Sequence, residues 1–97
     1  MNRDTILAAL QSLKPEFAKF GVLHVGLFGS YLRNEQTEKS DIDLLIDFAP
    51  EKETFDNFMA VCDLLENHFQ HYKIEVVTKN GLSPYIGSKI LKDVIYA

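Results

Sequence analysis

Hydrophobic residues recur at helical spacing in three stretches of the chain. Over residues 4–20 the apolar positions fall three or four apart, which predicts an amphipathic helix. Pro15 lies inside that pattern, so it either kinks the helix or starts a second, short one. Residues 54–69 predict another long amphipathic helix. Residues 83–94 predict a last one, because their opening Ser-Pro pair suits an N-cap followed by a first helical position.

Three shorter stretches have the β-branched and apolar content of buried strands. They cover residues 22–28, 41–48 and 72–78. A Gly-Ser break, a short helical turn beginning at Tyr31 and a polar loop over residues 34–40 separate the first two. This order of elements predicts an α/β (α+β) fold, in which a small mixed sheet is covered by helices mainly on one face.

Composition narrows the class of protein. Ninety-seven residues with 46% hydrophobic content suit one domain, over residues 1–97. The net charge of −4 argues against direct nucleic-acid binding, since such proteins neutralise phosphates with a basic face. No signal-peptide pattern and no run of about 18 apolar residues is present, so we expect a cytoplasmic protein without a membrane span. The single cysteine, Cys62, excludes an intrachain disulfide.

A pair of acids opens the second predicted strand. Asp41 and Asp43 are two positions apart, so in a strand both carboxylates project from one face while Ile42 turns into the core. Two like charges side by side on a buried strand repel each other and are costly to desolvate. A cation offsets that cost, and clustered carboxylates suit Mg²⁺ or Mn²⁺.

The Gly29-Ser30 break is a candidate phosphate site. Glycine lets a phosphate approach the backbone, turn N–H groups favour an anion, and the Ser30 hydroxyl adds a donor. Because only a short excursion joins the two strands, this turn and the acidic pair can converge and cradle a metal-bound triphosphate. Arg33 follows the turn and either pairs with the triphosphate or forms a surface salt bridge.

A third acid, Glu75, lies between apolar residues of the third predicted strand. It lies either on the solvent face or at the site. If the third strand pairs with the second, Glu75 supplies a third carboxylate, which helps to hold a metal ion or acts as a base.

The C-terminal part of the chain carries more apolar residues than a domain of this size easily buries. We therefore predict a contact face for a partner there. Its residues are Tyr85, Ile86, Ile90, Leu91, Val94, Ile95 and Tyr96. Tyr31 and Tyr85 are able to stack on a nucleobase, but core packing is the favoured interpretation for both.

Together these motifs resemble a known superfamily over essentially the whole chain. The pattern is Gly29-Ser30, ten residues, Asp41-x-Asp43, then Glu75 and Leu82-Ser83-Pro84-Tyr85. It resembles the DNA polymerase beta-like nucleotidyltransferases. Within them it is similar to the minimal nucleotidyltransferase antitoxins that are paired with HEPN ribonuclease toxins.

The resemblance implies a chemistry for each motif. It implies Mg²⁺, with two ions expected, and ATP as substrate. Asp41 and Asp43 would be metal ligands and Gly29 and Ser30 phosphate ligands, with AMP transferred to a tyrosine of the toxin. The third carboxylate of this superfamily is commonly aspartate, whereas this chain has Glu75. Two alternatives stay open: an antitoxin that acts by binding alone, and nucleotidyl transfer to a small molecule.

Overall fold

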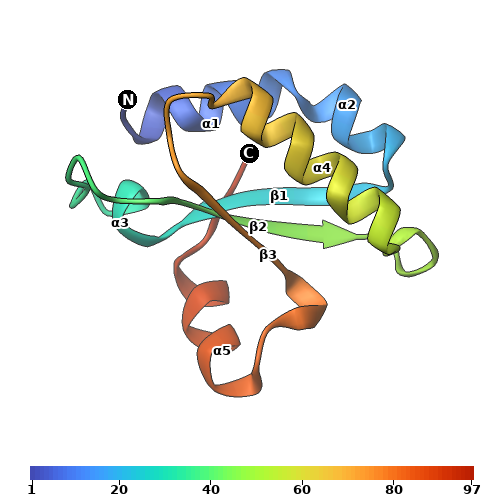
Figure 1. The fold of residues 1–97 in the computed structure, drawn as a ribbon. Helices are drawn as coiled ribbons and strands as arrows, with labels where there is room; N and C mark the ends of the chain where they lie inside the picture. The colour runs from blue at the N-terminus through green and yellow to red at the C-terminus, as the bar shows by residue number, and fades with distance from the viewer.

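A four-stranded mixed sheet runs through the centre of the computed structural model, which describes residues 1–97 (Figure 1). The strands are β1 (Val22–Phe28), β2 (Ile42–Phe48), β3 (Ile74–Thr78) and β4 (Ile95–Tyr96). Their order across the sheet is β3-β2-β1-β4. β1 is antiparallel to β2 and β4, whereas β2 and β3 are parallel. The predicted mixed sheet is therefore confirmed, and each predicted strand is present within two residues of its expected start.

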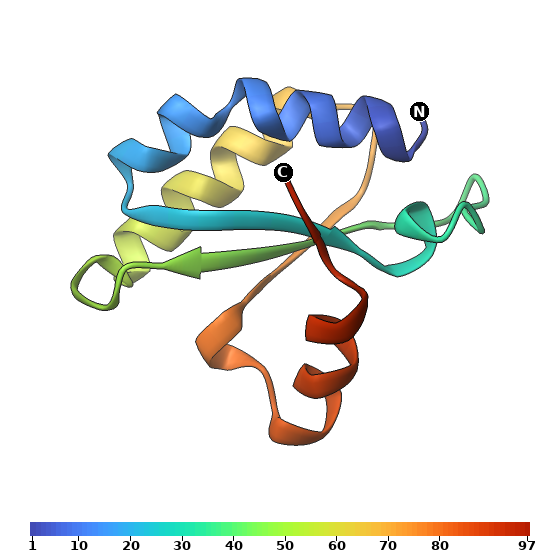
Figure 2. The same ribbon diagram turned by 180° about the vertical axis from the view of Figure 1, so that it is seen from behind.

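Helices cover the two faces of the sheet unequally. They are α1 (Arg3–Ser12), α2 (Lys14–Lys19), α3 (Gly29–Leu32), α4 (Phe55–His68) and α5 (Pro84–Asp93), with short 3-10 turns η1 (Pro50–Lys52) and η2 (Lys79–Gly81). α1, α2 and α4 lie together on one face, and α5 lies alone on the other (Figures 1 and 2). The structure thus confirms a sheet covered mainly on one face. None of its helices combines the length and the apolar character that a membrane crossing requires.

Local sequence explains where the helices begin. Pro15 starts a second short helix rather than kinking a long one, because it occupies the first turn of α2, where no backbone N–H is needed. The hydroxyl of Thr54 accepts a hydrogen bond from the Asn57 amide at 3.1 Å and caps α4. Ser83 caps α5 in the same way through the Ile86 amide at 3.3 Å, so the start predicted for the last helix is correct.

The hydrophobic core lies between the sheet and the three-helix layer. On β2 the even positions Ile42, Leu44 and Ile46 are fully buried against residues such as Leu10 of α1 and Leu65 of α4. Each such side chain contributes about 1.5–3 kcal/mol through removal from water. Because side chains alternate along a strand, the odd positions of β2 face α5 instead. The acids of this strand therefore point away from the core.

The structure adds one strand that the hydrophobic pattern did not predict. β4 pairs antiparallel with β1, Tyr96 opposite Gly26 and Ile95 opposite Leu27. A Cβ on Gly26 would collide with the side chain of Val94 and approach Tyr96 Cδ1 to 3.1 Å. Glycine at position 26 thus lets the end of α5 and β4 pack directly on the sheet. Two residues are too few to show a strand period, so no sequence pattern marked this element.

Candidate functional site

The acids on β2 and β3 meet across the parallel ladder. Asp43 is the register partner of Glu75, and neighbouring strands are about 4.8 Å apart. Asp43 is half-buried and Glu75 is exposed, so the pair spans the boundary between protein and solvent. The sequence placed Glu75 beside the acidic pair only if β3 pairs with β2, and the two strands do pair.

Electrostatics shows that the carboxylates influence one another. Burial, the largest cause, acts together with the charge of Glu75, a hydrogen bond with Glu75 and the charge of Asp41 to raise the pKa of Asp43 from 3.8 to about 6. Arg33 acts on it in the opposite direction. A divalent cation bound by these oxygens would relieve the repulsion, so the donor set fits Mg²⁺.

The structure does not close the three acids into a compact metal-ligand cluster. Asp43 and Glu75 are register partners that line one cavity, whereas Asp41 lies at the start of β2 and lines a different cavity. No group of three or more His, Cys, Asp or Glu side chains has the geometry of a metal centre. The carboxylates that sequence predicts are therefore neighbours, with Asp43 between the other two.

The glycine turn and the acidic strand converge as predicted. Phe28, the last residue of β1, pairs with Asp43 across the antiparallel ladder. Gly29 follows with φ +79°, and a Cβ there would overlap the Asp43 carboxylate, with Asp43 Cγ at 3.0 Å. Only glycine suits both this backbone conformation and this close approach. Ser30 is the next residue of α3, the short helix that Gly29 begins.

Arg33 forms the surface salt bridge that was one of its two expected roles. Its Nε donates to Glu35 Oε1 at 2.6 Å, and both side chains are more than half exposed. It also lines a small cavity with Gly29. Arg33 thus lies near the glycine turn, but Glu35 already neutralises part of its charge.

Two adjoining cavities separate the sheet from α5. The larger, about 510 Å³, has Asp43 and Glu75 on its polar side, with other walls from Phe28, Val77, Gly81, Leu82, Ser83, Ile86 and Ile90. The smaller, about 190 Å³, is lined by Phe28, Gly29, Arg33, Ile86, Lys89, Ile90 and Asp93. Ligand sites are commonly apolar cavities of this size with a few polar groups. The two cavities share Phe28, Ile86 and Ile90 as lining residues, so we treat them as adjacent parts of one candidate site.

A third cavity, about 450 Å³, lies on the Asp41 side. It is polar and is lined by Tyr31, Glu38, Lys39, Ser40, Asp41, His71, Tyr72 and Lys73. Burial and the neighbouring Tyr72 raise the pKa of Tyr31. Sequence reasoning treated residues 34–40 as a loop only, and their proximity to residues 71–73 depends on the β2–β3 pairing.

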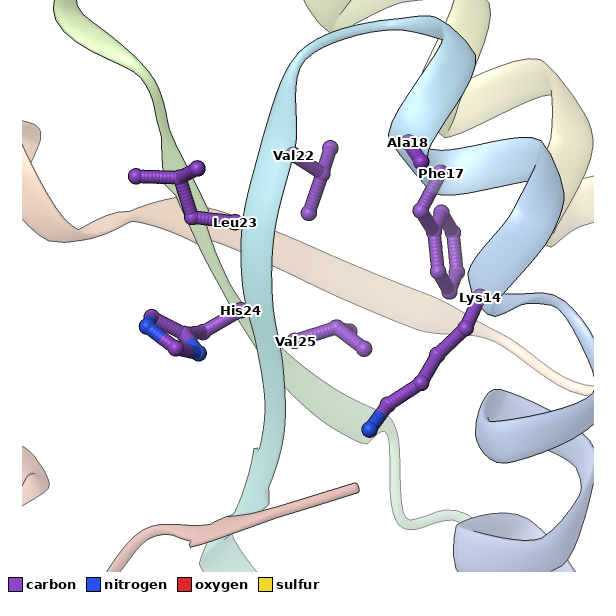
Figure 3. A pocket seen from close by; sticks show the side chains of 7 residues that line it. All are labelled: Lys14, Phe17, Ala18, Val22, Leu23, His24 and Val25. Atoms are coloured by element: carbon purple, nitrogen blue, oxygen red, sulfur yellow. The ribbon is translucent and has the colours of Figure 1, made fainter.

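A fourth cavity, about 210 Å³, lies at the opposite end of β1 from Gly29 (Figure 3). Val22 and Val25 point toward Phe17 of α2, whereas Leu23 and His24 point away from it. A register shift in β1 between Val22 and His24 places these two neighbours on one side of the strand. This cavity contains no carboxylate, so it is not a candidate for the acid-based chemistry.

The two tyrosines behave differently. Tyr31 is 4% exposed and belongs to the core, as expected. Tyr85 is 93% exposed, so core packing was the wrong prediction for it, because it stands in the first turn of a helix whose inner face begins one residue later. Sequence reasoning also missed the α5 residues of the site. Ile86 and Ile90 are four residues apart, and that helical spacing was the available signal.

Comparison with known proteins agrees with this arrangement. The family described as a nucleotidyltransferase domain matches residues 4–97. A Methanocaldococcus jannaschii protein named as a candidate protein adenylyltransferase is 40% identical over 84 residues, covering 80% of this chain and 79% of that one. Protein adenylyltransferase MntA of Thermococcus cleftensis is 36% identical over 78 residues, covering 80% and 77%.

Two solved structures share the fold. One, described as a candidate minimal nucleotidyltransferase, superimposes with a TM-score of 0.83 at 28% identity and covers 98% of this chain and 95% of its own. A toxin–antitoxin structure, a mutant MntA–HpeT complex, matches with a TM-score of 0.62 at 18% identity and covers 99% and 71%. The second likeness supports the fold alone.

Proposed function

Since this chain belongs to the nucleotidyltransferase domain family, we propose that it transfers AMP from Mg²⁺-bound ATP to a side chain of a partner protein. The observation that carries the proposal is the juxtaposition of Asp43, its register partner Glu75 and the Gly29 turn at two adjoining cavities. A carboxylate pair beside a close-approach glycine is suited to hold a metal-bound phosphate chain.

Each site residue has a role in this proposal. Asp41, Asp43 and Glu75 would hold Mg²⁺, with two ions expected, and the bound metal would supply neutralisation of the charge on the transferring phosphate. Gly29 and Ser30 bind the phosphates beyond it. The acceptor hydroxyl oxygen forms a bond to the α-phosphorus and its proton passes to Glu75 or to water, while the bond to the bridging β-phosphate oxygen breaks and pyrophosphate leaves with that electron pair. Glu75 is the exposed member of the carboxylate set and is therefore open to an acceptor from solvent.

An exposed apolar surface supports a protein as the acceptor. On α5 and β4, Tyr85 is 93% exposed and Ile86 61% exposed, and Leu91, Ile95 and Tyr96 are each more than 40% exposed. Several exposed apolar side chains on consecutive elements favour a protein contact there. The relative from Thermococcus cleftensis bears the name MntA, which is also the name of the protein bound to HpeT in the toxin–antitoxin complex, and this shared name favours a toxin partner. We propose a HEPN ribonuclease toxin, neutralised in the cytoplasm.

The test is label transfer from α-labelled ATP with Mg²⁺ to the product of a neighbouring toxin gene. We expect label on the toxin, and a loss of at least about a hundredfold in rate for Asp41→Asn and Asp43→Asn. Asp47→Asn is the matched control, since Asp47 shares the strand face but lines none of the four cavities. A stable complex that takes up no label would refute the transfer.

One observation favours a second candidate, neutralisation by binding alone. The three carboxylates do not form a compact metal-ligand cluster, and Glu75 stands where the superfamily commonly has aspartate. The double variant Asp41→Asn with Asp43→Asn separates the two functions. Cells that stay protected from the toxin by this variant would support binding, and cells that lose protection would support transfer.

A further inference from the structure

We propose that Lys89 of α5 binds the β- and γ-phosphates of the nucleotide and so makes α5 part of the substrate site. The inference rests on the proposed function, since it concerns the same nucleotide. It adds a residue that no sequence motif indicated, from an element on the other side of the cavity from the glycine turn.

The two cavities give the nucleotide a direction. Asp43 and Glu75 lie in the larger one, so the α-phosphate belongs there if these acids hold the metal. Gly29 lines the smaller one, next to the Asp43 carboxylate. A phosphate chain that starts at Asp43 and follows the glycine turn therefore enters the smaller cavity, where its terminal phosphates meet Lys89.

Charge points to Lys89 rather than to Arg33 as the principal cation there. The structure contains three ion pairs, and Arg33 is already engaged with Glu35 in one of them. Lys89 takes part in none, although it lines the cavity. A lysine with a flexible stem and no partner is suited to bind a phosphate group as a point charge.

The same helix face carries an opposing charge. Asp93 lies one turn beyond Lys89 and lines the same cavity. It repels a polyphosphate and lowers the local positive potential. The negative charge of Asp93 therefore offsets part of the attraction between Lys89 and a phosphate. Removing Asp93 should tighten polyphosphate binding, and removing Lys89 should weaken it.

The experiment is calorimetric titration of the full chain with Mg²⁺-ATP, Mg²⁺-tripolyphosphate and AMP. We expect Lys89→Ala to weaken ATP and tripolyphosphate by about tenfold to a hundredfold and to change AMP by less than about twofold. Lys89→Arg should restore most of the affinity, and Asp93→Asn should tighten ATP several-fold. Lys92→Ala is the control, an exposed lysine of the same helix that lines none of the cavities.

The outcomes separate the two proposals. If Lys89→Ala binds ATP as Lys92→Ala does, or loses ATP and AMP equally, Lys89 is not a terminal-phosphate ligand and the inference falls. If wild-type protein binds no Mg²⁺-ATP, both the inference and the transfer function fall. If ATP binding depends on Lys89 but no partner is labelled, the phosphate role stands and only the transfer to protein is refuted.

Discussion

The two faces of the sheet differ in role: one side of β2 packs in the hydrophobic core, and the other side carries the acids of the candidate site. On β2, Ile42, Leu44 and Ile46 face α1 and α4 and are fully buried, whereas Asp43 faces the larger cavity beneath α5. The first face is sealed by three helices, and the second is covered by one helix that leaves space. A 97-residue chain thus places nearly all of its core on one side and keeps the other side for charges that destabilise the unliganded protein.

The largest effect should come from truncating the sealed face. Leu44→Ala should lower the free energy of unfolding by about 2–5 kcal/mol, because a fully buried leucine leaves a cavity that three packed helices fill poorly. Urea unfolding measures this. Val77→Ala, which lines the larger cavity and is half-buried, should cost only about 1 kcal/mol. Equal losses for the two variants would remove the distinction between the faces.

A smaller loss of stability should follow from Gly29→Ala. The left-handed backbone at φ +79° and the overlap of a Cβ with the Asp43 carboxylate should together cost about 1–3 kcal/mol. Asn34→Ala is the control, since Asn34 also has a positive φ, of 58°, but lines none of the four cavities. If both variants lose the same stability and both bind ATP normally, the close approach to Asp43 is unimportant.

The smallest effect is a pH dependence of the cavity face. Because the folded protein raises the pKa of Asp43 to about 6 from 3.8, the folded state binds more protons than the unfolded state between these values. Asp43 should therefore contribute a stability that is greatest near pH 4 and declines as pH rises to about 6. Thermal melts in EDTA should show this decline in wild type and a weaker one in Asp43→Asn. Identical profiles would contradict it, and added Mg²⁺ at pH 7 should raise the melting temperature of wild type alone.

Sequence predicted most of the fold because its strands and helices are long enough to show their periods. The convergence of Gly29 with Asp43 could also be predicted, since a short excursion between adjacent strands leaves few alternatives. The role of Glu75 depended on which strand lies beside β2, and the parallel pairing settles that adjacency.

Features that depend on long-range packing could not be predicted. β4 exists only because Gly26 leaves room for Val94 and Tyr96. The contribution of Lys89 to a cavity depends on how α5 crosses the sheet. For Arg33 the sequence left open a contact with the triphosphate and a surface salt bridge, and the structure shows the salt bridge, with Glu35.

The short strand β4 holds the end of α5, and with it one wall of the cavities, against the sheet. β4 pairs with β1 through two residues, and the Ala97 amide donates one further hydrogen bond to the Val25 carbonyl at 2.9 Å. A ligand bound between α5 and the sheet would stabilise this strand pairing as well. The Ala97 amide is then a natural reporter of occupancy, since its exchange with deuterated solvent should slow whenever the cavities are filled.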